Sequence, residues 1–533
     1  MPRLYESVEP AQNGLPVPVF RSGSPACSRY APEREAERFA EAAQAGDVLL
    51  VAGMGGGYHV RALARRFPQA RILVAEYSRD DIAFLAGRLP AVRELLQDPR
   101  VLLLPCEEAE YALKEQYLPA VRPSFQFLEL RSWTAEAPDA AGKVREAVRR
   151  ALAGISADFS VQAHFGRLWQ HNILKNLEAA PAGTDISFPT EKTAVIAAAG
   201  PSLDDAARQI TERRDEFVVI ATDTAYRALQ RRNIRCDAVV SIDGQPISRA
   251  HFMSRPDSGA LFVFDVCGNP AALRKIMQSG CAAVLASTGH PLARYAEQHA
   301  DRSGGTARLL PLRAGAGTVA IAAADFALKA GFSKIVVAGA DFSYIGGRAY
   351  ARGTYLDDVY GAAQTRLRPA ETSFCSLLFR TELLDCGEAD GGSQEQGAAR
   401  KTTPVLDSYR RSFEQWASES GLELRMEGGL RLLLPAAEAE RRPPLPPKKE
   451  QWSGADFRAF AGALADDASE FQAGGPEQEL SPAETAVLPY AAWLRNRERP
   501  DECGGRLPFK TLAGEALEDA ARHTRQDGAQ RGK

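Results

Sequence analysis

The segment Thr193–Ala206, TAVIAAAGPSLDDA, constrains the fold of this chain more than any other part of its sequence. An apolar run with β-branched residues leads directly into Gly200, Pro201 and Ser202, and an amphipathic helical pattern begins at once. A strand, a tight turn and a helix in this order are the repeating unit of a parallel α/β sheet, and the turn is where such sheets bind phosphate. We therefore predict an α/β domain that begins near Thr193.

The same alternation of apolar strands and helical segments occurs in two regions of the chain. The first region begins at Asp47 with a strand, the glycine-rich loop GMGGGYH and a helix. Alternating strands and helices predict a parallel, doubly wound sheet, so we expect two Rossmann-like α/β domains. In the first region, one further strand is expected to end near Glu76, and two more are expected at 101–105 and 125–130. In the second region, a long helix is expected over 317–330, and the strands are expected at 193–198, 217–222, 237–242, 260–265, 281–286 and 334–339.

Changes in composition divide the chain further. Residues 1–35 have no regular pattern, and 344–403 has the composition of a long loop, which next to a sheet is often a binding loop. The segment AAEAERRPPLPPKKE is a charged, proline-rich linker. The expected organisation is an N-terminal domain at 1–140, a helical connector at 141–190, a central domain at 191–435, the linker at 436–450, and a helical C-terminal region with a loose tail at 451–533.

Charge and cysteine usage exclude several classes of protein. The formal net charge is −3, which provides no electrostatic attraction for nucleic acid. The eight cysteines contain no C-x-x-C pair and no zinc-type spacing. The start of the chain has no signal-peptide core, and no apolar run is long enough for a membrane span. We expect a cytoplasmic protein with reduced thiols, no metal site, no membrane span and no nucleic-acid partner.

Small and acidic residues follow the predicted strands of the central domain, at the edge where open α/β sheets bind ligands. Ser202 is expected to cap the helix after the turn, and Asp205 is expected to complete a capping box. Two interpretations of the turn stay open: it binds an anion, or it only starts the helix. Asp223 and Asp243 can accept hydrogen bonds from ribose or sugar hydroxyls, or can serve as a helix cap and a turn residue. Further candidates for binding a nucleotide or sugar are Ser287, Gly315, Gly317 and Thr318.

A second group of candidates lies in the loop after the strand at 334–339, VVAGADFSYIGGRAYARGTY. Asp341 directly follows the strand, and the loop contains several tyrosines and arginines. Arginines bind acidic ligands and tyrosines contact sugars, so this loop is expected to close over a substrate. Its candidate binding residues are Tyr344, Arg348 and Arg352.

The N-terminal domain has its own glycine loop, with Gly53, Gly55 and Gly57 after a strand and Glu76 at the end of the next strand. This spacing is similar to that of dinucleotide or S-adenosylmethionine loops, in which the acid binds ribose hydroxyls. Glycine-rich turns also occur in folds without a ligand, so both interpretations stay open. The chain contains no D-x-D clamp, no Walker A loop and no G-x-S-x-G elbow.

The order of these motifs resembles that of the motility-associated factor (Maf) glycosyltransferases, whose central domain is shared with the 6-hydroxymethylpterin diphosphokinase MptE-like proteins. The resemblance covers residues 45–435 and rests on LWQHNILKNL, GPSL, SIDGQ, GADFSY, GGRAYARGT and MEGGL. It implies transfer of a pseudaminic or legionaminic type of nonulosonic acid from a CMP-activated donor to Ser or Thr of flagellin. It also implies a sialyltransferase-like central domain, a general base and no tightly bound cofactor.

The loop departs from the family pattern at one position. Family members often have THAKGT where this chain has RAYARGT, so Tyr350 replaces the histidine expected to act as base. A tyrosine, with a pKa of about 10, is a poor base near neutral pH. Asp341, Asp357 or Asp358 are the remaining candidates for the base, with Tyr350 positioning the substrate. The alternatives are a non-catalytic protein that binds flagellin or a nucleotide sugar, and a pterin diphosphokinase-like enzyme.

Overall fold

All six strands expected in the central domain form, within two residues of their expected bounds. The structure is a computed structural model that describes residues 3–300, 307–315, 317–386, 400–427, 430–435, 445–471, 480–498 and 506–530. Two compact units share the chain. Unit 1 contains Met1–Gly166 and Leu488–Ala513, and unit 2 contains Arg167–Val487 and Gly514–Lys533.

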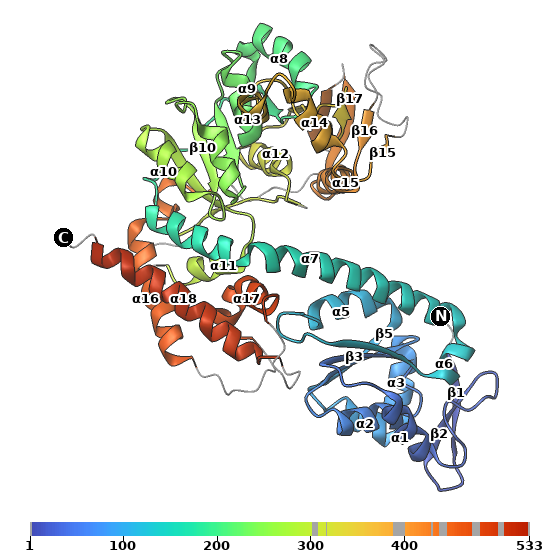
Figure 1. Ribbon diagram of the computed structural model, residues 1–533. Helices are drawn as coiled ribbons and strands as arrows, with labels where there is room; N and C mark the ends of the chain where they lie inside the picture. Colours follow the sequence, from blue (N-terminus) through green and yellow to red (C-terminus); the bar gives the residue numbers. More distant parts are fainter. Residues whose placement is uncertain are drawn as a thin grey trace. The chain divides into compact units, whose positions relative to one another are not determined.

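Unit 1 is built around a parallel four-stranded sheet with the order β5-β4-β3-β6 (Figure 1). The central strand β3 is apolar throughout and fully buried, as expected for a parallel sheet covered on both faces. Residues 5–20, which have no regular pattern in the sequence, form the antiparallel pair β1–β2. The strands are β1 (Tyr5–Pro10), β2 (Pro16–Phe20), β3 (Val48–Ala52), β4 (Arg71–Glu76), β5 (Val101–Pro105) and β6 (Phe125–Glu129), and the helices are α1 (Pro32–Ala42), α2 (Tyr58–Arg66), α3 (Arg79–Arg88), α4 (Pro90–Leu95), α5 (Ala109–Gln116) and α6 (Arg131–Glu136).

Unit 2 contains a nine-stranded sheet with the order β12-β11-β10-β9-β8-β7-β13-β18-β17. The strands from β7 to β13 are parallel, whereas β17 and β18 form an antiparallel hairpin beside β13 that the sequence patterns did not predict. The strands are β7 (Thr193–Ala197), β8 (Phe217–Thr222), β9 (Ala238–Ser241), β10 (Leu261–Asp265), β11 (Ala282–Ser287), β12 (Leu310–Pro311), β13 (Ile335–Ala338), β17 (Leu422–Glu427) and β18 (Leu430–Pro435).

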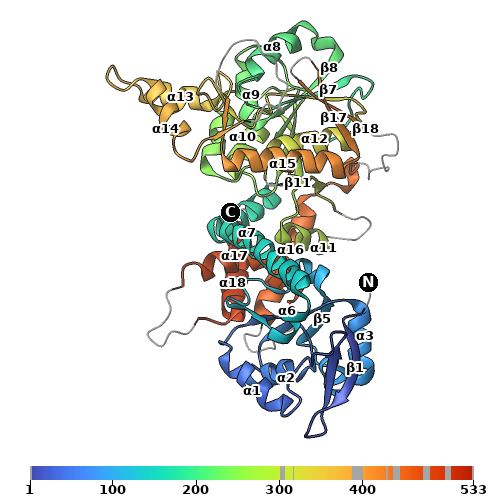
Figure 2. The ribbon, with the colours of Figure 1, turned by 90° about the vertical axis from the view of Figure 1, so that its right-hand side faces the viewer.

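One face of this sheet packs against the buried helix α12 (Val319–Lys329) and against α15 (Pro404–Glu419) (Figure 2). Phe413 and Trp416 of α15 join the same apolar core as α12, which fixes the helix under β7, β8, β9 and β13. The remaining elements between the strands are α8 (Leu203–Glu212), α9 (Asp223–Gln230), the short 3₁₀ helix η3 (Pro246–Phe252), α10 (Pro270–Gln278) and α11 (Pro291–Gln298).

The segment expected as a long loop at 344–403 is not irregular. It forms the helices α13 (Tyr355–Ala363) and α14 (Ala370–Leu378) and a three-stranded sheet of β14 (Tyr344–Ile345), β15 (Leu384–Asp385) and β16 (Arg400–Thr402). These pieces are too short for their periodicity to be recognised in the sequence. Residues 387–399 lie outside the described part of the chain.

The helical connector and the C-terminal region divide differently from the expectation. The long helix α7 (Pro138–Ala179) contributes residues to both units, and so do α17 (Pro482–Arg495) and α18 (Phe509–Gln530), whereas α16 (Gly454–Glu470) belongs to unit 2. Most of the expected linker at 436–450 lies outside the described residues. Among the helices that the structure describes, none combines the length and apolar character needed to cross a membrane.

Candidate functional site

The candidate site lies where the strand order of the unit 2 sheet reverses. The chain adds β8 to β12 on one side of β7 and then returns to place β13 on the other side. The loops after β7 and β13 therefore leave the sheet side by side, and the Gly200 N–H donates to the Gly339 carbonyl at 2.7 Å. Open α/β sheets bind their ligands at such a switch point, outside the carboxyl ends of the strands.

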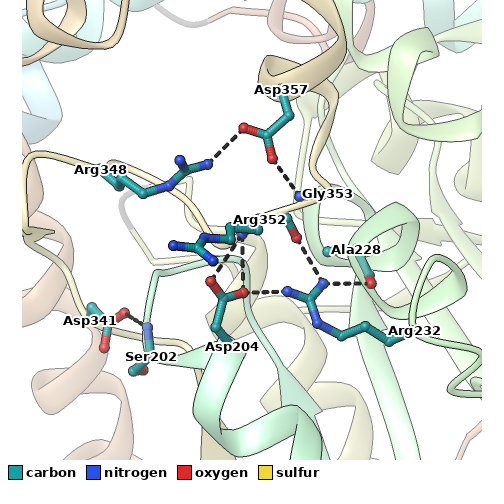
Figure 3. Close-up of polar contacts among 9 residues, drawn as sticks. All are labelled: Ser202, Asp204, Ala228, Arg232, Asp341, Arg348, Arg352, Gly353 and Asp357. Atoms are coloured by element: carbon teal, nitrogen blue, oxygen red, sulfur yellow. Dashed lines mark hydrogen bonds and ion pairs between the residues drawn. The ribbon is translucent and has the colours of Figure 1, made fainter. Parts of the chain in front are cut away.

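The turn at Gly200 leaves no space for a side chain. A Cβ at Gly200 would lie 2.4 Å from both the Asp341 Oδ2 and the Gly339 carbonyl oxygen, so only glycine fits. The Asp341 Oδ2 accepts a hydrogen bond from the Ser202 N–H at 2.8 Å (Figure 3). The expected capping by Ser202 is wrong, because its side chain makes no cap hydrogen bond. A carboxylate 139 residues further along the chain takes that place at the start of α8.

Asp341 thus occupies the anion position that the sequence assigns to a ligand. Its side chain is buried, and this burial raises the pKa of the carboxyl, while the hydrogen bonds from Ser202 and the nearby charges of Arg400 and Arg431 oppose the rise. The Arg400 Nη2 lies 3.8 Å from Oδ1. The residue joins the loops after β7 and β13.

The loop after β14 is fastened to the same turn. The Ala351 N–H donates to the Ala199 carbonyl at 2.8 Å, and the Arg352 N–H donates to the Asp204 Oδ1 at 3.1 Å. Arg232, which follows the end of α9, contacts both Asp204 and Arg352. Its Nη2 lies 2.5 Å from Asp204, and its Nη1 donates to the Arg352 carbonyl at 2.8 Å (Figure 3). The Arg352 side chain itself is exposed. The loop therefore docks beside the first turn of α8.

Asp357 and Arg348, two predicted site residues, bind each other. Their Oδ1 and Nη2 atoms lie 2.7 Å apart, and the Asp357 Oδ2 accepts from the Gly353 N–H at 2.5 Å (Figure 3). Arg348 also lies over the Phe374 ring at 4.7 Å. The pair therefore supports the start of α13.

The other candidate for the base in this helix, Asp358, is paired as well. Its carboxylate contacts the guanidinium groups of both Arg227 and Arg231 from α9. These contacts connect α13 to α9, and Asp358, like Asp357, is paired with arginine. Both carboxylates are therefore engaged by arginine side chains of the protein itself.

Tyr350 lies next to Tyr355, with ring centroids 6.5 Å apart. Burial raises the pKa of Tyr350 further above its usual value, and the neighbouring tyrosines and Asp223 act in the same direction. Tyr350 is therefore a poorer base than a free tyrosine. Tyr344, which the sequence grouped with it, is buried in β14 and pairs with Lys401 of β16.

Asp223 and Asp243 both lie at the carboxyl edge, as the sequence predicts. Asp223 is buried, and its Oδ2 accepts from the Ser241 Oγ at 2.9 Å. Thr222 rather than Asp223 caps α9. The Asp243 Oδ1 accepts from the Gln245 N–H at 2.9 Å, which forms a turn, and burial raises the pKa of its carboxyl.

The sequence reasoning missed His251, which belongs to the same edge. It lies on η3 and is only 4% exposed, and its ring meets the edge of Tyr355 at a centroid distance of 4.8 Å and an angle of 84°. Its Nδ1 is buried and has no hydrogen-bond partner among the described residues. The signal available in the sequence was a histidine in a short segment that begins at Pro246, directly after the SIDGQ strand end.

The turn before α12 contains Gly315 and Gly317, two of the candidate binding residues. Gly315 and Gly317 have φ of +53° and +88°, and a Cβ at Gly315 would lie 2.4 Å from the Ser412 Oγ. The side chain of Thr318 makes no cap hydrogen bond with α12. Ser287 is used locally, because its Oγ accepts from the Gly289 N–H at 3.2 Å.

Two asparagines of α7 brace the loops at this edge. The Asn172 Nδ2 donates to the Gly244 and Cys267 carbonyls at 3.0 and 2.9 Å. One turn later, the Asn176 Nδ2 donates to the carbonyls of Val266 and Gly268, both at 2.8 Å. The LWQHNILKNL segment therefore fixes the loops after β9 and β10.

The glycine loop of unit 1 is filled by the protein itself. Glu76 is fully buried, and its Oε2 accepts from the Tyr5 hydroxyl and the Met54 N–H at 3.0 and 2.8 Å. Its Oε1 accepts from the Trp133 indole and the Tyr77 N–H at 2.6 and 2.7 Å. These four bonds use the acceptor capacity of the carboxylate, so Glu76 has none left for a ribose.

The positions of the loop glycines agree with this packing. Gly53, Gly55 and Gly57 all have positive φ, and a Cβ at Gly53 would lie 2.5 Å from the Trp133 side chain. The glycines are thus required by the turn and by Trp133. Within the described parts of both units, no three His, Cys, Asp or Glu side chains gather in a way that could hold a metal ion.

Comparisons with known proteins agree with this architecture. The model of the family described as 6-hydroxymethylpterin diphosphokinase MptE-like matches residues 169–347. The solved structure of the Maf glycosyltransferase from Magnetospirillum magneticum AMB-1 is similar over 99% of this chain and 92% of that chain, with a TM-score of 0.51 and 14% identity. This likeness confirms the fold implied by the sequence motifs.

Two proteins of Treponema pallidum (strain Nichols), both described only as "Uncharacterized protein", are similar in sequence. One is 36% identical over 154 residues, which are 28% of this chain and 73% of the relative. The other is 29% identical over 276 residues, which are 52% of this chain and 80% of the relative. The chain therefore belongs to the same family as the first of these Treponema proteins, contains an MptE-like domain and has the fold of a Maf glycosyltransferase.

Proposed function

We propose that this protein is a cytoplasmic glycosyltransferase that moves a pseudaminic or legionaminic type of nonulosonic acid from a CMP-sugar to Ser or Thr of flagellin. The observation that carries the proposal is the switch point between β7 and β13, where two glycine turns and the docked loop at 344–355 converge. The likeness in fold to a Maf glycosyltransferase supports transferase chemistry at this edge. No tightly bound cofactor is required.

The donor phosphate is assigned to the start of α12. The first turn of α8 already receives the Asp341 carboxylate, which would repel a second anion. The helix α12 runs back from the carboxyl edge, and the side chain of Thr318 does not cap it. A helix N-terminus with free N–H groups favours a phosphate, and the small residues Gly315 and Gly317 allow close approach.

The sugar and nucleoside would then extend toward the ends of β8 and β9. Asp223 and Asp243 provide carboxylate oxygens for hydroxyl groups, and Tyr350 and Tyr355 provide aromatic faces and hydroxyls. The acceptor oxygen forms a bond to the anomeric carbon while the bond from that carbon to the phosphate oxygen breaks. CMP leaves, and the acceptor proton passes to a base.

The test uses the purified full chain. Thermal shift is measured with CMP, UDP and ATP·Mg²⁺, and a CMP-nonulosonate is then incubated with recombinant flagellin and followed by intact mass. We expect stabilisation by CMP and a mass increase of one sugar residue on flagellin. Stabilisation by CMP without added mass would instead indicate a non-catalytic binding protein.

A pterin diphosphokinase-like activity is the second candidate, because the MptE-like family model covers the switch point and most of its loops. In that case the carboxylates of Asp223 and Asp243 would bind the diphosphate donor. Stabilisation by ATP·Mg²⁺ alone, with diphosphate transfer to 6-hydroxymethylpterin, would replace the glycosyltransferase proposal.

A further inference from the structure

Two histidines of unit 2 have a buried ring nitrogen without a hydrogen-bond partner among the described residues, namely Nδ1 of His251 and Nε2 of His290. The role of His290 is structural, because its Nδ1 accepts from the Leu292 N–H at 3.1 Å and caps α11, and its ring packs against Trp169. His251 caps nothing, and its unbonded Nδ1 is an unusual feature, because buried polar atoms are normally paired.

His251 has aromatic and charged neighbours. Its ring contacts the edge of Tyr355 on one side and its chain neighbour Phe252 on the other. The positive form of the imidazole and the Asp243 carboxylate attract each other. From α9, the Arg227 Nη1 donates to the Ala250 carbonyl at 3.4 Å, next to His251.

His251 is connected to the switch point through the docked loop. Its contact Tyr355 is the first residue of α13, and Tyr350 lies 6.5 Å from Tyr355 between ring centroids. The residue after Tyr350, Ala351, donates its N–H to the Ala199 carbonyl of the Gly200 turn. One short loop therefore joins the imidazole to the edge where the donor is placed.

We propose that the Nδ1 atom of His251 accepts the proton of the acceptor hydroxyl in the transfer reaction. This inference rests on the proposed glycosyltransferase function. The O–H bond of the acceptor breaks, its proton moves to Nδ1, and its oxygen forms the new bond to the anomeric carbon as CMP leaves with the former C–O pair. The imidazolium is stabilised by the Asp243 carboxylate and then returns the proton to water.

The other groups at this edge are less suited to the task. Asp357 is bound to Arg348, and Asp341 accepts the Ser202 N–H. Tyr350 is held in its protonated form by burial and by neighbouring negative charge. His251 is a nitrogen base at this edge whose Nδ1 is buried and has no hydrogen-bond partner among the described residues.

The experiment compares the full-length wild type with His251→Asn and His251→Gln and, as a matched control, with His290→Asn, whose amide oxygen can still cap α11. Flagellin glycosylation with a CMP-nonulosonate is measured from acidic to alkaline pH, together with CMP binding. We expect the His251 variants to lose about 10²- to 10⁴-fold in kcat with CMP affinity within twofold of wild type. The decline of the wild-type rate toward acidic pH should disappear in these variants and persist in His290→Asn.

Each outcome decides one point. A wild type that transfers sugar together with a His251→Asn variant of unchanged kcat and pH profile would overturn the role of His251 and leave the glycosyltransferase function intact. A wild type without transfer would remove the proposed function itself. If both His251 variants fail to fold, nitrogen-labelled histidine NMR of the wild type decides, because only an accepting Nδ1 changes its shift when a serine peptide of flagellin is added to the CMP complex.

Discussion

The Asp341 carboxylate accepts a hydrogen bond from the Ser202 N–H at 2.8 Å, although the two residues lie 139 positions apart in the chain. This contact closes the first turn of α8 with a side chain from the loop after β13. It provides the negative charge that the macrodipole of α8 favours, and it moves the expected phosphate position away from this helix.

Replacing Asp341 separates its structural and electrostatic roles. Asp341→Asn keeps an oxygen that can accept the Ser202 N–H, whereas Asp341→Ala removes the cap and should lower the free energy of unfolding by about 0.5–2 kcal/mol in urea titrations. Because the Asp341 charge repels a phosphate, Asp341→Asn should bind CMP more tightly. An unchanged CMP affinity in calorimetry would place the phosphate far from Asp341.

The raised pKa of Asp341 gives this prediction a pH dependence. As the pH falls through that raised pKa, the carboxyl becomes neutral and its repulsion of the phosphate disappears. CMP affinity of the wild type should therefore increase toward acidic pH and approach that of Asp341→Asn. The variant itself should show less of this increase.

Arg232 fastens the loop at 344–355, because its guanidinium bridges Asp204 and the Arg352 carbonyl. Arg232→Ala removes both of these contacts, and since a single hydrogen bond from a charged donor is worth about 1.5 kcal/mol, kcat/KM should fall at least about tenfold. Limited proteolysis should cut the loop faster. As a control, Arg213 belongs to the exposed ion pair Arg213–Glu216, and Arg213→Ala should leave both measurements unchanged.

The parts of the fold that the sequence predicted are those with strong local patterns. The six predicted strands of the central domain, β7, β8, β9, β10, β11 and β13, have apolar runs, and the glycine turn at Gly200 follows the first of them. The hairpin β17–β18 was missed, although the alternation of apolar and charged residues in β17 is a strand pattern. The short pieces at 344–403 depend on tertiary contacts, which a local pattern does not contain.

The candidate site shows the same division. The edge position of Asp223 and Asp243 follows from the strand pattern and was predicted. The contact of Asp341 with the start of α8 was not predicted. The sequence suggested a local capping box, whereas the actual partner of the Ser202 N–H is distant in sequence. The position of His251 depends on the packing of η3 against α9 and α13, so no spacing rule indicated it.

Glu76 tests whether the glycine loop of unit 1 is structural. Glu76→Gln turns one acceptor oxygen into an NH₂ donor, so two of its four hydrogen bonds are lost inside the core. The free energy of unfolding should fall by about 2–4 kcal/mol, while CMP affinity should not change. The exposed Glu33→Gln is the control for stability, and a loss of CMP binding in Glu76→Gln alone would assign a ligand role to unit 1.

The paired histidines His171 and His523 predict acid sensitivity, with Nδ1 of one 3.4 Å from Nε2 of the other. Burial lowers the pKa of His171, and the charges of His523, Lys175 and Arg167 lower it further. Since the unfolded chain takes up this proton at a higher pH, the free energy of unfolding should decrease as the pH falls below about 6.5.

A single substitution isolates this contribution. In His171→Gln the decrease in stability between neutral and acidic pH should be smaller than in wild type, as measured by urea unfolding at each pH. His164→Gln, at an exposed position, should follow the wild-type curve. Parallel curves for His171→Gln and wild type would show that the pair does not contribute.

Hydrogen–deuterium exchange of the full chain with and without a CMP-nonulosonate tests the central claim most directly, namely that the donor binds at the β7/β13 switch point of unit 2. The donor should slow amide exchange in the turn at 198–203, in the loop at 339–352 and in the segment 315–320, and leave the glycine loop at 53–58 unchanged. Protection confined to the unit 1 loop, or no protection at the switch point at a saturating donor concentration, would contradict the assignment.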